Sequence, residues 1–422
     1  MTEALDLATY DPMERSTQQN PFPYYAELRK RAPVFQHPKS GLFFVSTMDG
    51  VLEVLGKPKL FSSRASKPPL TAAGPVAEEL QKIEREGYPN LATMLTADPP
   101  EQTRYRKSIG KPFTPRRIRE FEPLLRQVAT DLIDRWPTQG EVAFFESFAL
   151  PLPIRAISYA LGMAPELEAD IKRWSDDSVA SLGVAISDAR RLEAARGVVE
   201  SQKYWASRFD EARRNPVGDI VSNLVNADFE DHAGDVRKLE VAEFISMMRQ
   251  FMVAGNETTT KLFTEAMRLL IENPGEWQRI REDPTLIPAM VEEALRLSAP
   301  NQGLFRTVTE DTELQGVPLR RGSRLWIIFG SANRDEKYFP DPDRFDPTRE
   351  NVREHLAFGK GTHVCPGAPL SRLEAVVGFE ELVRRVGSVG FAKGYEVEYE
   401  PSFVLRGLTR LDLVVSKVDE AN

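Results

Sequence analysis

The chain contains a single cysteine, Cys365, within the stretch FGKGTHVCPG that covers residues 358–367. A lone cysteine is most often a small buried apolar residue, but such residues usually lie in periodic apolar segments. Here Gly359 and Gly361 precede the cysteine, and Pro366 follows it directly. Glycine permits positive φ and lets the backbone approach a flat ligand closely, whereas proline has no N–H to donate. The loop is therefore typical of a site at which sulfur contacts a ligand.

The segment after this loop, GAPLSRLEAVVGFEELVRR, predicts a helix with Pro369 in its first turn. The helix dipole and unpaired amides favour a sulfur anion at that position. A zinc site would need about four ligands, and the four histidines do not lie at ligand spacing. A cysteine protease would need a general base and an acyl-transfer pocket, which no other motif supports. An iron macrocycle needs only one protein ligand, and a thiolate below haem iron favours O–O cleavage.

The loop resembles the haem-binding loop of the cytochrome P450 family, and GAPLSR continues the match. The matching residues are Phe358, Gly359, Gly361, His363, Cys365 and Gly367. The likeness covers nearly the whole chain and is strongest to the bacterial soluble branch. It implies haem b as the cofactor, Cys365 as the ligand of its iron, and Phe358 and Gly359 as cofactor-binding residues. The implied activity is a monooxygenase that inserts one atom of O2 into a small or medium apolar organic substrate.

One long helical pattern runs from Glu240 to Asn273, where Asn273-Pro274 predicts its end. The stretch AGNETT lies half-way along it, and Gly255 inside a helix costs up to about 1 kcal/mol relative to alanine. This stretch resembles the acid-threonine pair of the family. The resemblance implies that Thr258 donates hydrogen bonds to the bound oxygen, and that Glu257 and water relay protons for O–O cleavage. Many family members have Asp where this chain has Glu257.

Haem has two propionates, so cations should flank it. The segment DPPEQTRYRKSIGKPF, residues 98–113, resembles a helix of the family that carries a propionate-binding arginine at the position of Arg106. Gln102 stands where many relatives have histidine and can still donate a hydrogen bond. Arg306, in FRTVTED, and His363 match two further propionate partners.

Glu293 and Arg296 stand three residues apart on one predicted helix face. In a chain with 28% charged residues such a pair is usually a solvated surface pair. FPDPDRF follows at the distance that the family shows, and Arg344 resembles the third member of its Glu-Arg-Arg cluster. We expect a structural role, in which a buried ion network holds the following Pro-Asp-rich segment.

Basic residues gather near these motifs on a chain whose formal charge is −8. They are Lys107, Lys111, Arg116, Arg117, Lys360 and Arg372. We expect a docking surface for an acidic redox partner of the 2Fe-2S ferredoxin or flavodoxin kind, because no reductase segment is fused to the chain. The alternative is an ordinary solvated face.

The substrate pocket is the least specified part of the site. If Thr258 faces the iron, Ala254 and Gln250 lie one and two turns earlier on the same helix face, with Val253 beside them. We expect Gln250 to hydrogen-bond a polar group on the substrate; a pair with a neighbouring helix is the alternative. Leu304, Phe403 and Val404 resemble family pocket positions, and the Pro- and Ala-rich segment 66–95 is expected to cover the pocket.

Composition favours a soluble cytoplasmic protein. The acidic balance, with a pI near 5.4, argues against general binding to nucleic acid or anionic lipid. The N-terminus has no basic region followed by an apolar one, so no secretory signal is predicted. No run reaches the roughly 18 apolar residues of a membrane span. We expect a monomer.

The pattern along the chain predicts an α+β fold that is mainly α, and the resemblance implies one P450 domain over 1–422. The β-rich parts are expected at 30–65, 306–330 and 390–416, and the helical parts at 98–300 and 366–388. After Pro115, apolar residues at spacings of three and four predict one amphipathic helix through Ile118 to Leu132.

Two other functions stay open at this stage. One is a peroxide-driven peroxygenase or a haem-thiolate isomerase, against which the retained Glu257 and Thr258 speak, because peroxide already supplies the O–O bond and its protons. The other is a non-catalytic haem sensor, which would bind haem but consume no electrons when substrate is added.

Overall fold

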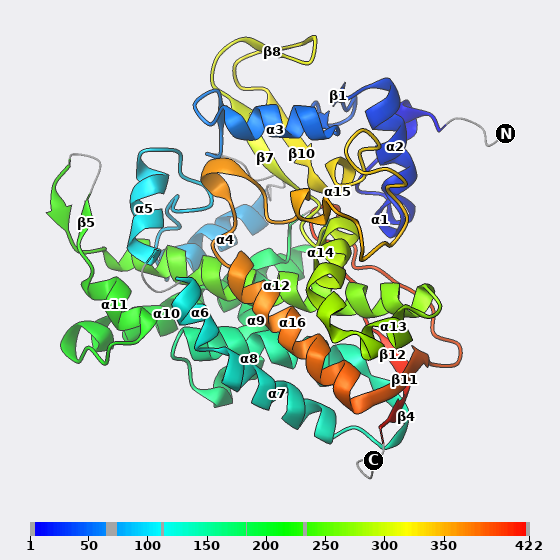
Figure 1. The fold of residues 1–422 in the computed structure, drawn as a ribbon. Helices are drawn as coiled ribbons and strands as arrows, with labels where there is room; N and C mark the ends of the chain where they lie inside the picture. The colour runs from blue at the N-terminus through cyan, green and yellow to red at the C-terminus, as the bar shows by residue number, and fades with distance from the viewer. Residues whose placement is uncertain (1–4, 65–73, 111–113, 183, 231–233, 419–422) are drawn as a thin grey trace.

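The computed structural model describes residues 5–64, 74–110, 114–182, 184–230 and 234–418. Figure 1 shows a small sheet region at the top and a large array of helices below it. No helix in the described ranges is both long enough and apolar enough to cross a bilayer.

The strands form two sheets and two hairpins. The five-stranded sheet has the order β1-β2-β10-β7-β3, and the three-stranded sheet has the order β11-β12-β4. In the larger sheet, β10 pairs antiparallel with β7, and Leu325 lies opposite Arg306. The strands are β1 Val34–Gln36, β2 Phe43–Val45, β3 Phe61–Ser62, β4 Gln139–Ala143, β5 Phe229–Glu230, β6 Val236–Arg237, β7 Gly303–Val308, β8 Thr312–Leu314, β9 Val317–Leu319, β10 Arg324–Ile328, β11 Val386–Phe391 and β12 Asp412–Lys417.

Helices make up most of the remaining structure, as the sequence predicted. They are α1 Arg15–Gln19, α2 Phe22–Arg31, α3 Met48–Gly56, α4 Pro75–Arg85, α5 Glu101–Ile109, α6 Pro115–Arg119, α7 Glu122–Asp134, α8 Pro151–Ala160, α9 Glu168–Val179, α10 Asp188–Arg214, α11 Ile220–Asn226, α12 Val241–Glu272, α13 Glu276–Glu282, α14 Ile287–Ser298, α15 Phe329–Ala332 and α16 Ala368–Arg385. Short turns of other helical types include Gly361–His363, directly before the cysteine.

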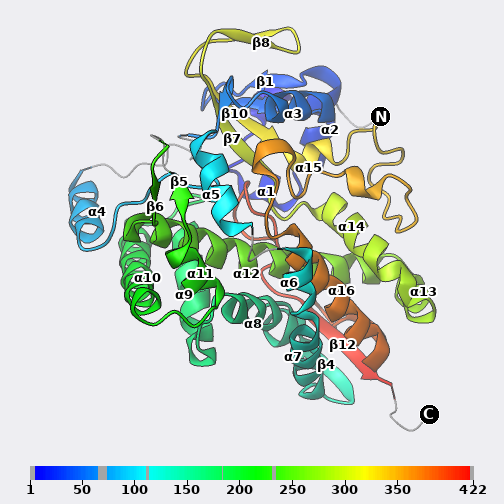
Figure 2. The same ribbon diagram turned by 60° about the vertical axis from the view of Figure 1, so that its left-hand side comes forward.

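The helix α12 runs through the middle of the molecule, which Figures 1 and 2 show from two sides. Glu240 and Glu243 form a capping box at its N-terminus, so two of its first N–H groups are satisfied. Asn273 caps its other end directly before Pro274. The predicted limits, Glu240 and Asn273, are therefore the two cap residues.

The amphipathic helix predicted after Pro115 is two helices, α6 and α7. Pro123 has no N–H to donate and is tolerated only in the first turn of a helix, so it forces a new helix to begin at Glu122. The apolar spacing is confirmed, because Leu125 and Leu132 are buried in α7.

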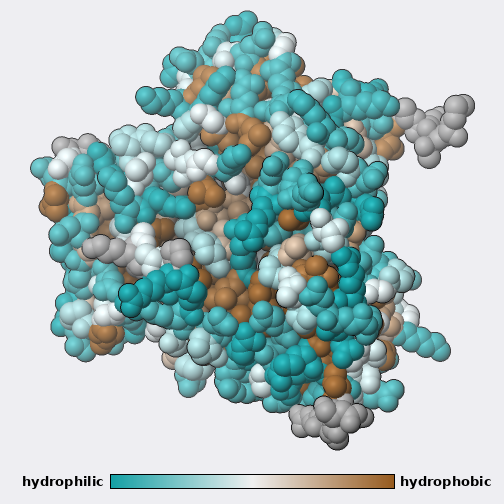
Figure 3. Space-filling model, viewed as in Figure 1, coloured by the Kyte–Doolittle hydropathy of each residue, from teal (hydrophilic) through white to brown (hydrophobic). Residues whose placement is uncertain are grey.

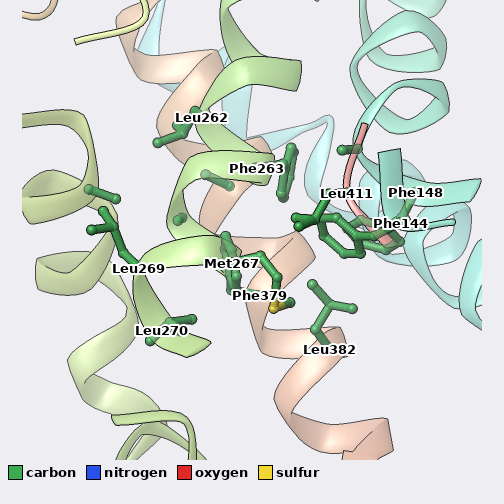
Figure 4. Close-up of a cluster of buried hydrophobic side chains, with 14 of the residues drawn as sticks. Phe144, Phe148, Leu262, Phe263, Met267, Leu269, Leu270, Phe379, Leu382 and Leu411 are labelled. Carbon is green, nitrogen blue, oxygen red and sulfur yellow. The ribbon is translucent and has the colours of Figure 1, made fainter. Parts of the chain in front are cut away.

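A core of aromatic and aliphatic side chains fixes α16 against α12. Figure 4 shows Phe263 and Met267 of α12 directed toward Phe379 and Leu382 of α16. The rings of Phe263 and Phe379 lie 5.7 Å apart. A Cβ at Gly378 would come within 2.6 Å of the Phe263 ring, so only glycine permits this approach. This contact places the start of α16, and thus the cysteine loop, relative to α12.

Candidate active site

The cysteine loop is shaped by two glycines in the left-handed region. Gly359 has φ of 66° and Gly361 has φ of 72°, which side chains rarely adopt. Between them and α16 the backbone turns back, and the N–H of Cys365 donates to the carbonyl of Phe358 at 2.9 Å. Pro369 occupies the first turn of α16, as predicted.

The thiol of Cys365 meets the first amides of α16. Burial raises its pKa, and hydrogen bonds from the backbone of Gly367 and Ala368, together with the charge of Arg106, act in the opposite direction. The amides that the sequence predicted for a sulfur anion are present, but burial outweighs them in the free protein. A metal that replaces the thiol proton would reverse this balance, because metal ligation deprotonates a thiol outright.

Phe358 packs beside the loop against the main core. The guanidinium of Arg372 lies 4.5 Å from its ring centroid. The Arg372 side chain also donates to both carboxylate oxygens of Glu292, at 2.6 and 3.0 Å. The charge of Arg372 is therefore already paired with Glu292, and its place in a docking surface stays a prediction.

Two guanidinium groups lie near the loop without a carboxylate partner within 4.0 Å among the described residues. Arg306 is buried, and its side chain donates to the carbonyl of Phe305 at 2.7 Å. Burial lowers its pKa to about 10, with Asp98 acting in the opposite direction. Arg106 donates to the carbonyl of Val364 at 2.6 Å, and burial lowers its pKa as well. Both cations would be stabilised by an anion that is not part of the protein.

Two other predicted propionate partners make contacts within the protein. The amide of Gln102 is buried and donates to the carbonyl of Thr362 at 2.8 Å, so this side chain holds the loop. His363 has its Nδ1 3.1 Å from the Met94 carbonyl and its Nε2 3.0 Å from the Ser63 hydroxyl. Because a carbonyl only accepts, Nδ1 carries the proton and Nε2 accepts from Ser63. Burial, aided by the charge of Arg306, lowers the pKa of His363 to about 4.

These features fit a porphyrin with two carboxylates. Cys365 offers one soft ligand next to backbone donors, and the left-handed glycines set the turn of the loop that leads to it. Arg306 and Arg106 offer positive charge that the described residues do not balance. The donor set therefore suits an iron macrocycle and its acidic substituents.

Thr258 and Glu257 lie on α12 but point to different surroundings. The hydroxyl of Thr258 donates to the carbonyl of Ala254 at 2.9 Å, and Ala254 is exposed although it lies mid-helix. The carboxylate of Glu257 is buried and lies 3.1 Å from Lys261 and 3.9 Å from Lys172. Burial would raise its pKa, but the two ammonium groups outweigh burial and lower it.

Lys261 was missed by the sequence analysis. Its ammonium group is almost fully buried between Glu257 and Glu400, 2.9 Å from the latter. Burial acts to lower its pKa, but the two carboxylates outweigh burial and raise it. The i, i+4 spacing of Glu257 and Lys261 was the available indication.

The ion network behind the site is built around Glu293 and Arg296, whose side chains are fully buried and joined at 2.7 Å. Arg296 also donates to the carbonyls of Asn333 and Pro342, both at 2.8 Å. The prediction that Arg344 is the third member is wrong. Its side chain is exposed, and only its carbonyl accepts from Arg296, at 3.2 Å. Arg349 takes the position instead, with its Nε 3.5 Å from Glu293.

Comparison with known proteins identifies the family. The family model for cytochrome P450 matches residues 201–386. Cytochrome P450 107B1 of Saccharopolyspora erythraea is 36% identical over 331 residues, 78% of this chain and 78% of that protein. The 6-deoxyerythronolide B hydroxylase of the same organism is 32% identical over 400 residues, 92% of this chain and 94% of that one. This chain belongs to the cytochrome P450 family.

Structural similarity to other members of the family confirms the P450 fold. The structure of cytochrome P450 CREJ in complex with (4-ethylphenyl) dihydrogen phosphate matches this P450 with a TM-score of 0.88 at 30% identity. The match covers 97% of this chain and 100% of that one. The chain is therefore an oxidoreductase, a haem-dependent monooxygenase of bacterial type.

The predicted pocket residues fall into two groups. Gln250, Val253 and Ala254 are partly exposed on α12, although the helix is otherwise largely buried. The amide nitrogen of Gln250 donates to the hydroxyl of Thr93 at 2.7 Å, so it pairs with a loop residue and not with a neighbouring helix. A contact of Gln250 with substrate stays a prediction. Thr93 belongs to the segment 66–95 expected to cover the pocket, of which residues 66–73 lie outside the described ranges.

The second group of predicted pocket residues has packing roles. Phe403 meets Trp326 edge to face at 4.9 Å, and Val404 is buried in the same cluster. Phe403 lines a separate cavity of about 480 Å³ between the N-terminal segment and the five-stranded sheet. Leu304 is half-buried on β7 and packs on a cluster formed by residues of that sheet and of α3. Contact of these three residues with substrate stays a prediction.

Proposed function

We propose that this P450 binds haem b through Cys365 and inserts one atom of O2 into a small or medium, largely apolar substrate. Electrons would come from a separate acidic carrier. Bound haem would supply the activation of O2, and a thiolate ligand favours cleavage of the O–O bond. The observation that carries this proposal is the position of Cys365, whose sulfur receives two backbone hydrogen bonds beside cations without a carboxylate partner.

The residues of the chain would hold the haem in position and transfer protons. Arg306 and Arg106 would bind the propionates, because each has donors that no carboxylate of the described chain satisfies. The hydroxyl of Thr258 would keep its proton on Oγ1, which donates to the Ala254 carbonyl in this structure. The same oxygen would accept a hydrogen bond from water on the exposed side. Glu257 would exchange protons with that water only after its carboxylate leaves Lys261.

The substrate cannot be taken from the similar proteins. Their names refer to compounds as different as 6-deoxyerythronolide B and an aryl phosphate ester. The exposed stripe on α12 supports a substrate that contacts Val253 and Ala254 through apolar surface.

Electron delivery would occur on the side of the cysteine loop. Figures 1 and 2 place α5, α6 and the start of α16 on this side, and Figure 3 shows hydrophobic residues near the centre of the same face. Val364 is 39% exposed there, and Lys107, Arg116 and Lys360 are exposed as well. An apolar centre with surrounding cations suits an acidic one-electron carrier. Lys111 lies outside the described residues.

The test is turnover in ¹⁸O2 with NAD(P)H, ferredoxin reductase and ferredoxin, followed by mass spectrometry of the product. We expect one labelled oxygen atom per product molecule and a rate that depends on the carrier. Comparable turnover with hydrogen peroxide alone would instead support the peroxygenase. The Glu257–Lys261 pair gives that alternative a structural basis, because it withholds the carboxylate from proton transfer.

A further inference from the structure

A cavity of about 480 Å³ lies between the N-terminal segment and the five-stranded sheet, and the proposed function does not use it. Its wall includes Phe305 of β7, Arg324 at the start of β10, and Phe403. Successive side chains of a strand point to opposite faces, so Phe305 and the adjacent Arg306 lie on opposite faces of the sheet. The cavity is therefore on the other side of the sheet from Arg306, the cation that we propose to bind a propionate.

Aromatic rings form much of the wall of this cavity. Phe305 and Phe403 meet edge to face, with their ring centroids 6.3 Å apart. Phe44 of β2 also lines the cavity, and its ring stacks on the imidazole of His37 at 5.3 Å. Rings of this kind favour a further aromatic ring in offset or edge-to-face contact. The volume lies within the range of small-molecule sites, roughly 300–1,000 Å³.

A cation stands in the same wall as these rings. The guanidinium carbon of Arg324 lies 5.9 Å from the ring centroid of Phe305. The side chain of Arg324 is half-buried, and burial lowers its pKa. A carboxylate brought next to this group by a ligand would favour its charged form.

The other charges of the lining balance one another. The ammonium group of Lys39 lies 2.9 Å from the carboxylate of Asp11. The backbone N–H of Ser40 donates to Nδ1 of His37 at 3.3 Å, and Nε2 of His37 lies 2.9 Å from the Tyr10 carbonyl. This imidazole is therefore neutral, with its proton on Nε2. The net charge of the lining is that of Arg324, which favours an anionic ligand.

We propose that this cavity is a second ligand site, separate from the haem site, and that it binds an aromatic carboxylate. The aromatic ring would contact Phe305 and Phe403, and the carboxylate would accept two parallel hydrogen bonds from Arg324. An aromatic carboxylate carries its ring next to its charge, so it can contact the guanidinium and the phenyl ring of this wall at once. The inference goes beyond the proposed function, because it assigns a ligand to a part of the molecule that the oxygen chemistry does not use.

The experiment uses the haem-loaded, full-length protein saturated with 4-phenylimidazole, which occupies the iron and the space above it. 2-Naphthoate and biphenyl-4-carboxylate are titrated beside 2-naphthamide and octanoate, and binding is measured by calorimetry. The same titrations are made with Arg324→Gln and with Gln36→Trp, which places a larger side chain among the lining residues. Arg321→Gln is the matched control, because it removes an exposed charge outside the lining.

We expect both aromatic carboxylates to bind at one site while the absorption spectrum of the azole complex stays unchanged. 2-Naphthoate should bind about tenfold more tightly than 2-naphthamide, or better. Arg324→Gln should remove most of this preference, Gln36→Trp should weaken all the aromatic ligands, and Arg321→Gln should change neither. Octanoate should bind more weakly than 2-naphthoate, because it has no ring to contact the aromatic wall.

Displacement of the azole by the carboxylates, or no binding while the azole is bound, would overturn the inference. Equal affinity for 2-naphthoate and 2-naphthamide, or a preference that survives Arg324→Gln, would overturn it as well. Equal affinity for octanoate and 2-naphthoate would contradict the aromatic class of ligand. If Gln36→Trp does not fold, the comparison of Arg324→Gln with Arg321→Gln decides, and their thermal midpoints show whether both are folded.

Discussion

The ammonium group of Lys261 lies 3.1 Å from the carboxylate of Glu257, one helical turn away and inside the protein. Glu257 therefore has a competing partner for the proton-relay role that the family resemblance implies. Lys172 and Asp176 of α9 also act on Glu257, and Glu400 shares Lys261. The pair fixes the carboxylate in its charged form and away from the neighbouring Thr258 hydroxyl.

Replacing Lys261 should change how proton delivery depends on pH. In Lys261→Met, burial is opposed only by the more distant Lys172 and by the hydrogen bond with Asp176, so the pKa of Glu257 should rise. Glu257 would then hold a proton at higher pH, and the fraction of electrons recovered in product should persist to higher pH than in the wild type. Oxygen uptake and product yield between pH 6 and 9 measure this. An unchanged profile, with Lys261→Arg as the charged control, would argue against the pair.

The same substitution should also lower stability. Removing one member of a buried ion pair leaves an uncompensated charge and costs about 3–5 kcal/mol. Denaturant unfolding of the haem-loaded protein should show this loss for Lys261→Met and a smaller one for Lys261→Arg. Wild-type stability in Lys261→Met would mean that water replaces the ammonium group.

Thr258→Ala should separate oxygen binding from productive oxygen use. The hydroxyl that donates to Ala254 would be lost, while Cys365, Arg306 and Arg106 are untouched. Haem content and substrate affinity should stay near wild type, and oxygen should be diverted to peroxide. Peroxide formed per NAD(P)H gives the readout, with Thr258→Ser as the hydroxyl control. Full coupling in Thr258→Ala would remove this residue from the mechanism.

Substitutions at Arg344 and Arg349 provide a matched pair of variants that tests the ion network around Glu293. Arg349→Gln should cost about 2–4 kcal/mol and lower haem retention, because it leaves Glu293 with one guanidinium fewer. Arg344→Gln should change the free energy of unfolding by less than about 0.5 kcal/mol, since its side chain is exposed. Denaturant unfolding and haem titration compare the two. A larger effect at Arg344 would restore the sequence prediction.

Glu292 should make the P450 sensitive to acid. Burial opposes ionisation, but His355 and Arg372 outweigh it and lower the pKa of Glu292 to about 2. A depressed carboxyl pKa contributes stability that is present above the unfolded value, near 4.5, and is lost as pH falls through the folded value. The contribution is roughly 3 kcal/mol. Unfolding free energies from pH 6 to 3 should fall more steeply in the wild type than in Glu292→Gln; parallel curves would exclude this residue as the cause.

Helix ends that are marked by capping residues or by a following proline were predictable from the sequence. Glu240 and Asn273 bound α12 as predicted, because caps and a following proline act within a few residues. The break between α6 and α7 was missed because the apolar spacing continues across it. Pro123 did not mark the break clearly, since proline is allowed in the first turn of a helix.

Side-chain partners over long sequence separations were less predictable. The resemblance supplied Glu293 and Arg296 but selected Arg344 instead of Arg349, because a segment without periodicity does not show which arginine turns inward. Arg372 looked like a free surface charge since Glu292, 80 residues away, is brought to it only by the packing of α14 on α16.

The central claim is that the sulfur of Cys365 ligates haem iron. The most direct measurement is the absorption spectrum of the reduced carbon monoxide complex, recorded for the wild type and Cys365→Ser after expression with ample haem supply. The claim predicts a thiolate-type spectrum in the wild type and its loss in Cys365→Ser. A wild-type protein without bound haem, or a thiolate-type spectrum that survives in Cys365→Ser, would contradict it.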